Sequence, residues 1–448
     1  MKENPRSMEN QQELEIRQYE SRLFPLNRSL TGDGVRETYK ILNEISPFDV
    51  KEIPSGTKVF DWEVPKEWKV NQAYIEVDGN RIIDFKNNNL HLVGYSTPTD
   101  QLLTYKELEP HLLTDPTKPE VIPYRTSYYK DDWGFCMKDW DKRLLKKDAK
   151  YHAVVDTELF DGSMTLGEKV IKGKSSQEYI ISTYSCHPSM ANDNLSGMLT
   201  WAFLMRELSS KKNHFTYRFI IGPETIGALT HLKSMDHYKV KGAFAICTTA
   251  GSGEHSFKET FKGNDDLDRA TRLAFRDLKV EAKVYPFDVK GSDERQFSSQ
   301  AFRIPTIGIY KGKYYEEYNY HTSRDNRLNT GGLLDNLEIY KYVIESLESN
   351  KKYESVYKEG EPMLGKRDLY PNVGGLLRDG KPSRIFNENK RDFKVGKVEY
   401  GNPVDAMLWV LFYADGKTSL IDIAEKTSFP VRQLSESALT LKEKGLLK

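Results

Sequence analysis

From Tyr151 onward, two kinds of apolar pattern alternate along the chain. Short runs rich in β-branched and aromatic residues predict strands at 151–157, 179–186, 216–222, 241–247 and 304–310. Apolar residues at helical spacing predict helices at 194–210, 226–236, 264–278 and 331–349. This alternation is typical of a mostly parallel sheet with helices on both faces. We therefore expect one large α/β domain, to which two helices between residues 9 and 45 also belong.

A chain of 448 residues is too long for one ordinary core, and two smaller parts stand out beside the α/β pattern. Residues 57–135 give short alternating runs broken by Pro, Gly and Asn, which predict an inserted β-rich domain. Residues 403–448 give three helical patterns whose spacing resembles a winged helix. The predicted domains are an α/β domain at 1–56 and 136–358, the β-rich domain at 57–135 and a winged-helix domain at 365–448.

Charge and cysteine content exclude several classes of protein. Lys+Arg and Asp+Glu are equal at 66 each, so no net field attracts nucleic acid or an anionic membrane. No apolar run approaches the roughly 18 residues of a membrane span, and the N-terminal residues lack the apolar core of a signal peptide. We therefore expect a cytoplasmic protein. Cys136, Cys186 and Cys247 form no Cys-x-x-Cys pair, which argues against a disulfide framework or a thiolate zinc knuckle.

The stretch 178–201 reads as a strand, a loop and a helix. His187 stands where the strand ends, and Asp193 with Asn194 stands where the helix should begin. In open α/β sheets this rim is where ligands collect, and an imidazole with a carboxylate can form half of a zinc site. The same residues also fit a plainer interpretation, in which Asp193 or Asn194 caps the helix and His187 makes an ordinary hydrogen bond.

Three further positions at predicted sheet termini carry reactive side chains. Glu224 follows one strand directly, Asp293 and Glu294 follow a turn, and His321 lies in the loop after the last strand. Taken singly, Glu224 is also explained as a carboxylate favoured at a helix N-terminus, and the others as ordinary loop residues. Four such positions in order along the chain favour a shared site.

The order His, Asp-Asn-x-Ser-Gly, Glu-x-x-Gly, Ser-Asp-x-x-x-Phe and Tyr-His-Thr-x-x-Asp resembles the zinc aminopeptidases of the leucyl aminopeptidase and glutaminyl cyclase superfamily. Phrases that begin at Arg28, Trp133 and Cys186 resemble more closely the bacterial aminopeptidase-like domain proteins, which carry an inserted β module and a C-terminal winged helix. The resemblance implies a zinc-exopeptidase-like mixed sheet flanked by helices. It also implies that the metal ligands are His187, Asp193 and His321, and that Glu224 is the general base.

Two ligands of the family pattern are missing here. Thr225 stands where co-catalytic members carry a second acidic residue, and the strand that runs into Cys247 is followed by no carboxylate. The remaining His187, Asp193 and His321 predict a mononuclear catalytic site with one Zn²⁺ per chain and room for water. Cys247 is an alternative soft ligand, although burial in a strand disfavours it.

The resemblance implies hydrolysis of an amide bond beside a free amino group, and Glu224 would move the proton of an activated water. Asp293 or Glu294 is the candidate carboxylate for the substrate's α-amino group. The inserted domain and its aromatic cluster suggest a walled pocket for short peptides, although such clusters also form ordinary core. Cyclisation of N-terminal glutamine, or amide hydrolysis on an amino sugar, would use the same zinc and the same Glu224.

The C-terminal helices raise a different possibility, a regulator that binds DNA. Residues 401–448 contain six basic and six acidic residues, and the would-be recognition helix carries Glu436 and Glu443 beside Arg432. Since nothing there forms a basic stripe, nucleic acid is disfavoured as a partner. We expect a protein contact or homo-oligomerisation through this domain, and no membrane partner.

Overall fold

The computed structural model describes residues 5–370 and 398–448, with side chains from residue 11 onward. Contacts divide these residues into two compact units. The larger unit comprises Arg6–Phe261 and Lys283–Asn336, and the smaller comprises Pro5, Lys262–Ala282 and the described part of Leu337–Lys448. Within the described ranges, no helix combines the length and the apolar character that crossing a membrane requires.

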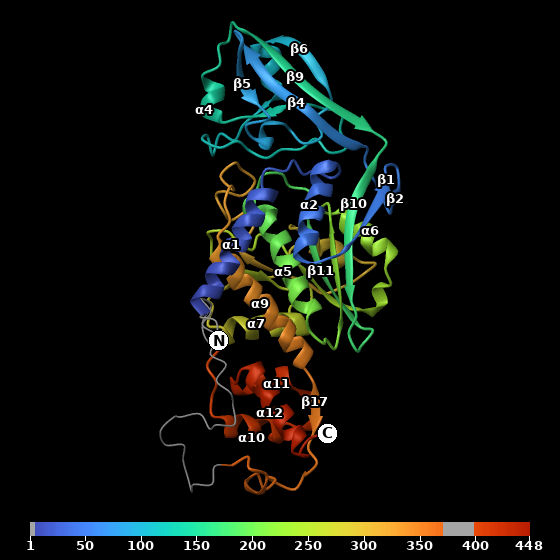
Figure 1. The fold of residues 1–448 in the computed structure, drawn as a ribbon, viewed down its shortest axis with the longest axis vertical. Coiled ribbons are helices and arrows are strands. Elements are labelled where there is room, and N and C mark those ends of the chain that lie inside the picture. Colours follow the sequence, from blue (N-terminus) through green and yellow to red (C-terminus); the bar gives the residue numbers. More distant parts are fainter. Residues whose placement is uncertain (1–4, 371–397) are drawn as a thin grey trace. The chain divides into compact units, whose positions relative to one another are not determined.

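An eight-stranded mixed sheet forms the centre of the larger unit (Figure 1). Its strands, in spatial order, are β1 (Asp49–Pro54), β10 (Ser163–Ile171), β12 (Thr216–Gly222), β11 (Glu178–Tyr184), β13 (Val240–Ala245), β16 (Thr306–Lys311), β14 (His255–Lys258) and β15 (Lys283–Tyr285). The four strands β12, β11, β13 and β16 run parallel, while β1, β10 and β14 pair antiparallel to their inner neighbours. The predicted mixed α/β class is confirmed.

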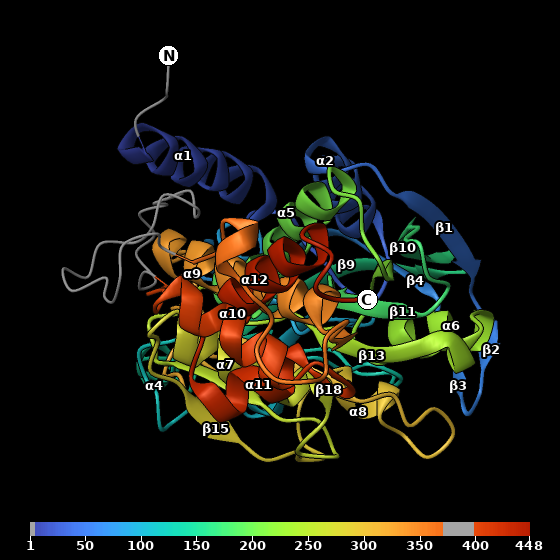
Figure 2. The same cartoon turned by 90° about the horizontal axis from the view of Figure 1, so that it is seen from below.

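Helices cover both faces of this sheet (Figure 2). They are α1 (Pro5–Leu23), α2 (Asp33–Ile45), α5 (Gly197–Ser209), α6 (Ile226–Ser234) and the short α8 (Glu294–Phe297). The chain passes from β11 to β12 in one direction along the sheet and from β12 to β13 in the other, so right-handed crossovers put α5 and α6 on opposite faces. Trp201 of α5 packs edge-on against Phe219 and donates its indole N–H to the Ile181 carbonyl. The alternate residues Ile180 and Ile220 pack with α6 on the other face.

The inserted region forms a second, four-stranded sheet in the order β5 (Asn80–Asp84), β4 (Glu67–Val77), β9 (Lys150–Phe160) and β6 (Thr99–Thr104). The smaller elements of the region are β2 (Lys58–Val59), β3 (Trp62–Glu63), α3 (Tyr105–Leu108), β7 (Leu112–Leu113), β8 (Phe135–Cys136) and α4 (Asp139–Arg143). We expected the strand at 151–157 in the large sheet, and that expectation was wrong because β9 pairs with β4 and β6. Figure 1 shows β9 running directly into β10, so the chain returns to the large sheet there. These strand pairings do not define domain boundaries, so the predicted end of the β-rich domain at residue 135 stays a prediction.

The smaller unit contains α7 (Asp266–Asp277), the later part of α9 (Thr330–Ser349), and the C-terminal elements. These are β17 (Lys352–Glu354), α10 (Pro403–Phe412), β18 (Asp415–Ser419), α11 (Leu420–Thr427) and α12 (Val431–Glu443). The three predicted helices are confirmed, and their starts follow capping rules: Asn402 accepts from the Val404 N–H, and Ser419 forms a capping box. Residues 371–397 of the predicted winged-helix domain, and residues 1–4, lie outside the described residues.

Candidate metal centre and active site

The predicted ligands and the predicted general base, Glu224, lie beyond the carboxyl ends of the parallel strands. His187 follows β11, Glu224 follows β12, and His321 lies in the loop after β16. Asp193 lies in an irregular turn, 191–196, that leads into α5 and departs from helical backbone angles at Asp193 and Asn194. The carboxyl ends of neighbouring parallel strands meet at one edge of a sheet, so the topology brings these loops together.

Asp193 lies between the two histidines. One of its carboxylate oxygens, Oδ1, is 3.2 Å from His187 Nδ1, and the other, Oδ2, is 2.9 Å from His321 Nε2. His187, Asp193 and His321 each present one ligand atom, and these three atoms lie within 4.8 Å of one another. The Asp193 side chain is only 1% exposed, so its charge has no access to bulk water.

The donor set fits a zinc ion. Two imidazoles and a carboxylate are the ligand types of catalytic zinc sites, which keep a further position open. Asp193 Oδ2 and His321 Nε2 are buried, and although they lie 2.9 Å apart, neither makes a hydrogen bond of good geometry among the described residues, as expected of atoms that bind a cation. Burial alone would raise the pKa of Asp193, but the nearby His187 and His321 outweigh burial and hold it below its ordinary value. The two histidines therefore favour the ionised form of this carboxylate, which is the form that a metal ligand needs.

Residues outside the ligand set hold Asp193 in place. The Asp325 carboxylate accepts hydrogen bonds from the backbone N–H groups of Asn192 at 2.6 Å and Asp193 at 2.8 Å. The Tyr184 hydroxyl, at the end of β11, donates to Asp193 Oδ1 at 2.5 Å. Such contacts orient metal ligands and tune their affinity.

A buried arginine supports His187 in the same way. Arg28 is 1% exposed, and its Nε donates to the His187 carbonyl oxygen at 2.9 Å. Its Nη1 donates to the carbonyl of Leu23, the last residue of α1. Arg28 therefore ties the first helix of the chain to the strand end that carries a predicted ligand.

Glu224 faces the same centre. Its Oε2 lies 3.8 Å from His187 Nε2, and its side chain is 26% exposed, more than that of either His187 or Asp193. Burial raises the pKa of Glu224, which makes the carboxylate a better proton acceptor. The backbone around it is fixed by two contacts: the Glu224 N–H donates to Cys186 Sγ, and the Thr225 N–H donates to Asp293 Oδ1 at 2.7 Å.

The two candidate carboxylates for substrate binding have different surroundings. Asp293 is close to Glu224, and burial, followed by the charge of Glu224, raises its pKa to about 8. Glu294 pairs with Lys258 instead, with its Oε1 2.6 Å from Nζ, and its Oε2 accepts from the Ser292 N–H. Since Lys258 and Glu294 side chains are 2% and 1% exposed, the charge of Glu294 is already neutralised in the interior.

At the two positions where the sequence lacks an acidic ligand of the family pattern, the structure supplies no carboxylate from Thr225 or Cys247. Thr225 adopts a positive φ of 68° just before α6. Cys247 is buried, and among the described residues it belongs to neither of the groups that could hold a metal. The second such group consists of Cys186, His187 and Glu224, so the thiol that approaches the centre is Cys186. Cys247 therefore gains no support as a ligand.

The inserted region contributes one wall of the centre. The Tyr124 ring packs edge-on against both imidazoles, with centroids 5.2 Å from His187 and 5.1 Å from His321. Its backbone N–H donates to the His321 carbonyl oxygen, and its hydroxyl bonds to that of Tyr128. Tyr124 and Tyr128 belong to the predicted aromatic cluster, which also contains Tyr129, Trp133 and Phe135. Within this cluster, Tyr124 both packs in the core and contacts the candidate ligands.

The sequence motifs point to His187, Asp193, Glu224 and His321 but assign no role to three residues that support them: Arg28, Tyr184 and Asp325. Of these, Arg28 and Asp325 lie within the quoted motifs, and Tyr184 ends the strand that precedes His187. The positions of these residues in the motifs were therefore visible in the sequence, but their contacts with the candidate ligands are visible only in the folded structure.

Two models of known protein families match this chain. The family model "Domain of unknown function (DUF4910)" matches residues 17–350. This chain belongs to the DUF4910 family. A second model, winged helix-turn-helix, matches residues 393–448, which agrees with the helices α10 to α12.

Relatives extend this likeness to the whole chain. A curated protein of Clostridium acetobutylicum is 40% identical over 433 residues, 95% of this chain and 94% of its own length; its name provisionally assigns it to polysaccharide biosynthesis and gives it an aminopeptidase-like domain. A crystal structure from Clostridium acetobutylicum, provisionally described as a peptidase, has a TM-score of 0.88 at 37% identity and covers 98% of this chain and 97% of that chain. BSAP, a zinc aminopeptidase from Bacillus subtilis, has a TM-score of 0.53 at 13% identity and covers 74% and 95%. This member of the DUF4910 family therefore has an aminopeptidase-like fold followed by a winged helix.

Proposed function

We propose that this protein is a zinc-dependent aminopeptidase-like hydrolase with a mononuclear site that acts on short peptides. The observation that carries the proposal is the meeting of His187, Asp193 and His321 within 4.8 Å, with the Glu224 carboxylate 3.8 Å from His187. Support comes from the aminopeptidase-like domain of the 40% identical relative and from the peptidase description of the 37% identical structure.

In the proposed reaction, the candidate metal ligands and Glu224 have different roles. Zinc, when held by His187, Asp193 and His321, supplies a Lewis acid that polarises an amide carbonyl and acidifies a water molecule. Glu224 Oε2 accepts the proton of that water and returns it to the nitrogen of the leaving amine. Proton transfer by a positioned carboxylate accounts for roughly a hundredfold to ten-thousandfold in rate.

The α-amino group of a peptide substrate needs a carboxylate near the metal. Of the two candidates, Asp293 is retained because it lies beside Glu224, whereas Lys258 already neutralises Glu294. Because burial and Glu224 raise the pKa of Asp293 to about 8, its carboxyl group would pair with the α-amino group by ionising as that cation enters the site. The Tyr124 ring against the two histidines limits the space on the side of the inserted region. Such a wall favours a short chain over a folded protein as substrate.

Amide hydrolysis on an amino sugar is the second candidate. It uses the same ligands and the same Glu224, and the name of the Clostridium acetobutylicum relative, which points to polysaccharide biosynthesis, favours it. Fold alone does not separate the two substrates, because function depends on the details of the site.

A substrate panel tests the proposal. Metal-loaded protein is assayed with dipeptides, amino-acyl anilides, N-terminal glutamine peptides and N-acetylated amino sugars, each with zinc, cobalt and manganese. We expect turnover of the amino-acyl substrates, and loss of at least about a hundredfold in Glu224→Gln with metal content unchanged. Turnover of the amino sugar alone would select the second candidate, and no turnover of any substrate by metal-loaded protein would contradict a hydrolase.

A further inference from the structure

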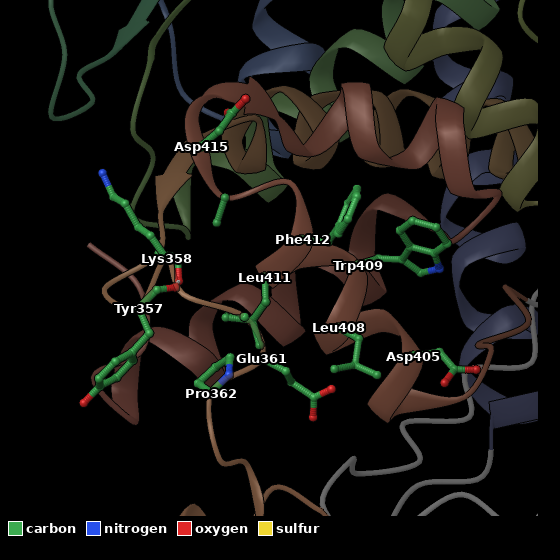
Figure 3. A pocket seen from close by; sticks show the side chains of 13 residues that line it. Tyr357, Lys358, Glu361, Pro362, Asp405, Leu408, Trp409, Leu411, Phe412 and Asp415 are labelled. Carbon is green, nitrogen blue, oxygen red and sulfur yellow. Dashed lines mark hydrogen bonds between the residues drawn. The ribbon is translucent and has the colours of Figure 1, made fainter.

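The smaller unit contains a pocket of about 910 Å³ that is separate from the metal ligands in sequence and in residue content. One side is formed by α10 and the other by the segment that follows β17, from Ser355 to Pro362. Figure 3 shows Leu408 and Leu411 of α10 facing Glu361 and Pro362 across the pocket. A pocket of this volume is large enough for a drug-sized molecule or a few side chains.

Helix α10 is apolar on more than its inner face. Its one charged residue is Asp405, and the inner face is buried through Val404, Ala406, Met407 and Val410. The remaining face of α10 lines the pocket with Leu408, Trp409, Leu411 and Phe412. Phe412 is 73% exposed and Trp409 38% exposed. A helix that is apolar all round is normally covered on every side, so this face is suited to a partner.

The charged groups of the pocket are mainly acidic. Glu361, Asp405 and Asp415 line it together with one cation, Lys358, whose ammonium is 2.7 Å from Glu354 and thus already paired. The Asp415 carboxylate accepts from two backbone N–H groups of its own turn. Glu361 and Asp405 have no ion pair within the part of the chain that the structure describes. Apolar side chains beside two carboxylates that have no ion pair among the described residues suit an apolar side chain next to a cation.

The same charges argue against nucleic acid on this domain. Phosphates are attracted by clustered Lys and Arg, but residues 401–448 contain as many acidic as basic residues, and Arg432 of α12 is paired with Glu338 and Glu345. The acidic pocket would repel a polyanion. These charges favour a protein over nucleic acid as the partner of this domain, and they favour a basic partner over an acidic one.

We propose that the pocket binds a linear basic segment of a partner protein, with an aromatic or branched apolar side chain between α10 and residues 355–362. A neighbouring Lys or Arg of the segment pairs with Glu361 and Asp405. Recognition of this kind combines an apolar anchor with charge complementarity at the rim.

The test uses the full chain and two short fluorescein-labelled peptides. In the first, Phe and Leu are flanked by Lys and Arg; in the second, Glu replaces the basic residues. Fluorescence anisotropy should show binding of the basic peptide and none of the acidic one. Trp409→Ala and Phe412→Ser should each weaken binding about tenfold, and Asp405→Lys should weaken it and flatten its dependence on salt.

Matched controls lie on α12 of the same domain, away from the pocket lining. Leu439 is 51% exposed, so Leu439→Ala removes an exposed apolar side chain, and Glu443→Lys reverses an exposed charge. Both should bind the basic peptide as the wild type does.

Three results would overturn the proposal. Equal binding of both peptides would show that charge plays no part. Binding that appears only after residues 371–397 are replaced by a Gly-Ser linker would assign the pocket to the chain's own segment. Failure to bind, with a dimer in sedimentation that Trp409→Ala dissociates, would assign it to a second copy. None of these results would bear on the proposed hydrolase, whose residues lie in the other unit.

Discussion

Asp193 shows how much of the proposed metal centre depends on residues outside the set of candidate ligands. Its carboxylate faces two histidines, accepts from Tyr184, and sits on a backbone turn held by Asp325. A carboxylate so completely held has little rotational freedom to lose when it binds a cation, so the site is preorganised.

Tyr184→Phe tests this support directly. The change removes the hydroxyl that donates to Asp193 Oδ1 at 2.5 Å and leaves the ring in place. Loss of such a contact typically lowers metal affinity by about ten- to a hundredfold. Competition with a zinc chelator measures the affinity. The control is Tyr151→Phe, which also loses a hydroxyl bond, to the Lys146 carbonyl, but lies in the small sheet. Equal affinity in wild type and Tyr184→Phe would count against the support.

A buried histidine gives a pH-dependent stability. His231 of α6 is 5% exposed, and burial lowers its pKa to about 4, although the nearby Glu168 opposes the shift. The unfolded chain, with an ordinary pKa of about 6.5, binds more protons in this range, so stability is fully present above about pH 6.5 and is lost as pH falls towards 4.

The expected size of that loss is about 2 kcal/mol between about pH 7.5 and about pH 5. Urea unfolding of wild type and His231→Leu at the two values measures it. The variant should lack this part of the pH dependence, whereas an identical pH dependence in both proteins would show that His231 titrates normally.

The candidate ligands could be selected from the sequence because strand-end positions are visible in a period-two pattern followed by a helical one. His187, Glu224 and His321 stand at such positions. The environment of Glu294 could not be predicted, because its partner Lys258 lies on β14. This strand has only four residues, and the sequence pattern did not predict it. A contact between distant segments depends on sheet order, which local patterns do not contain.

At the level of elements, the same limit explains β9. The alternation of residues 151–157 correctly predicts a strand, but such a strand can pair in either the eight-stranded or the four-stranded sheet. Helices were predicted more completely, since α5, α6, α7 and α9 each bury an apolar stripe that is visible in the sequence. Their boundaries moved by only a few residues, as capping and fraying lead one to expect.

The ion pair between β14 and α8 makes a prediction about an element. Lys258→Met leaves the Glu294 carboxylate buried without its cation, which should destabilise the larger unit by about 3–5 kcal/mol. The double variant Lys258→Met/Glu294→Leu removes both charges and should recover most of that loss. Urea unfolding of the two variants and the wild type measures these differences in the free energy of unfolding. A single variant as stable as the wild type would show that Glu294 finds another partner or water.

On the scale of the whole molecule, the chain combines an aminopeptidase-like fold, a small inserted sheet and a winged helix, and the family model for DUF4910 spans the first two. The candidate ligands all lie in the larger unit, and the acidic pocket lies in the smaller. Each unit therefore has its own test, and the proposal of a peptide-binding pocket stands or falls independently of the hydrolase.

The central claim is that His187, Asp193 and His321 hold one metal ion, and metal content measures it most directly. Protein purified and loaded with zinc is analysed by mass spectrometry as wild type, His187→Ala, His321→Ala and His152→Ala. His152 is the matched control because it also contacts a carboxylate, Asp100 at 2.6 Å, but on the small sheet. We predict about one zinc per chain in wild type and His152→Ala, and a several-fold lower content in the other two. Equal zinc in all four proteins, or none in the loaded wild type, would contradict the account.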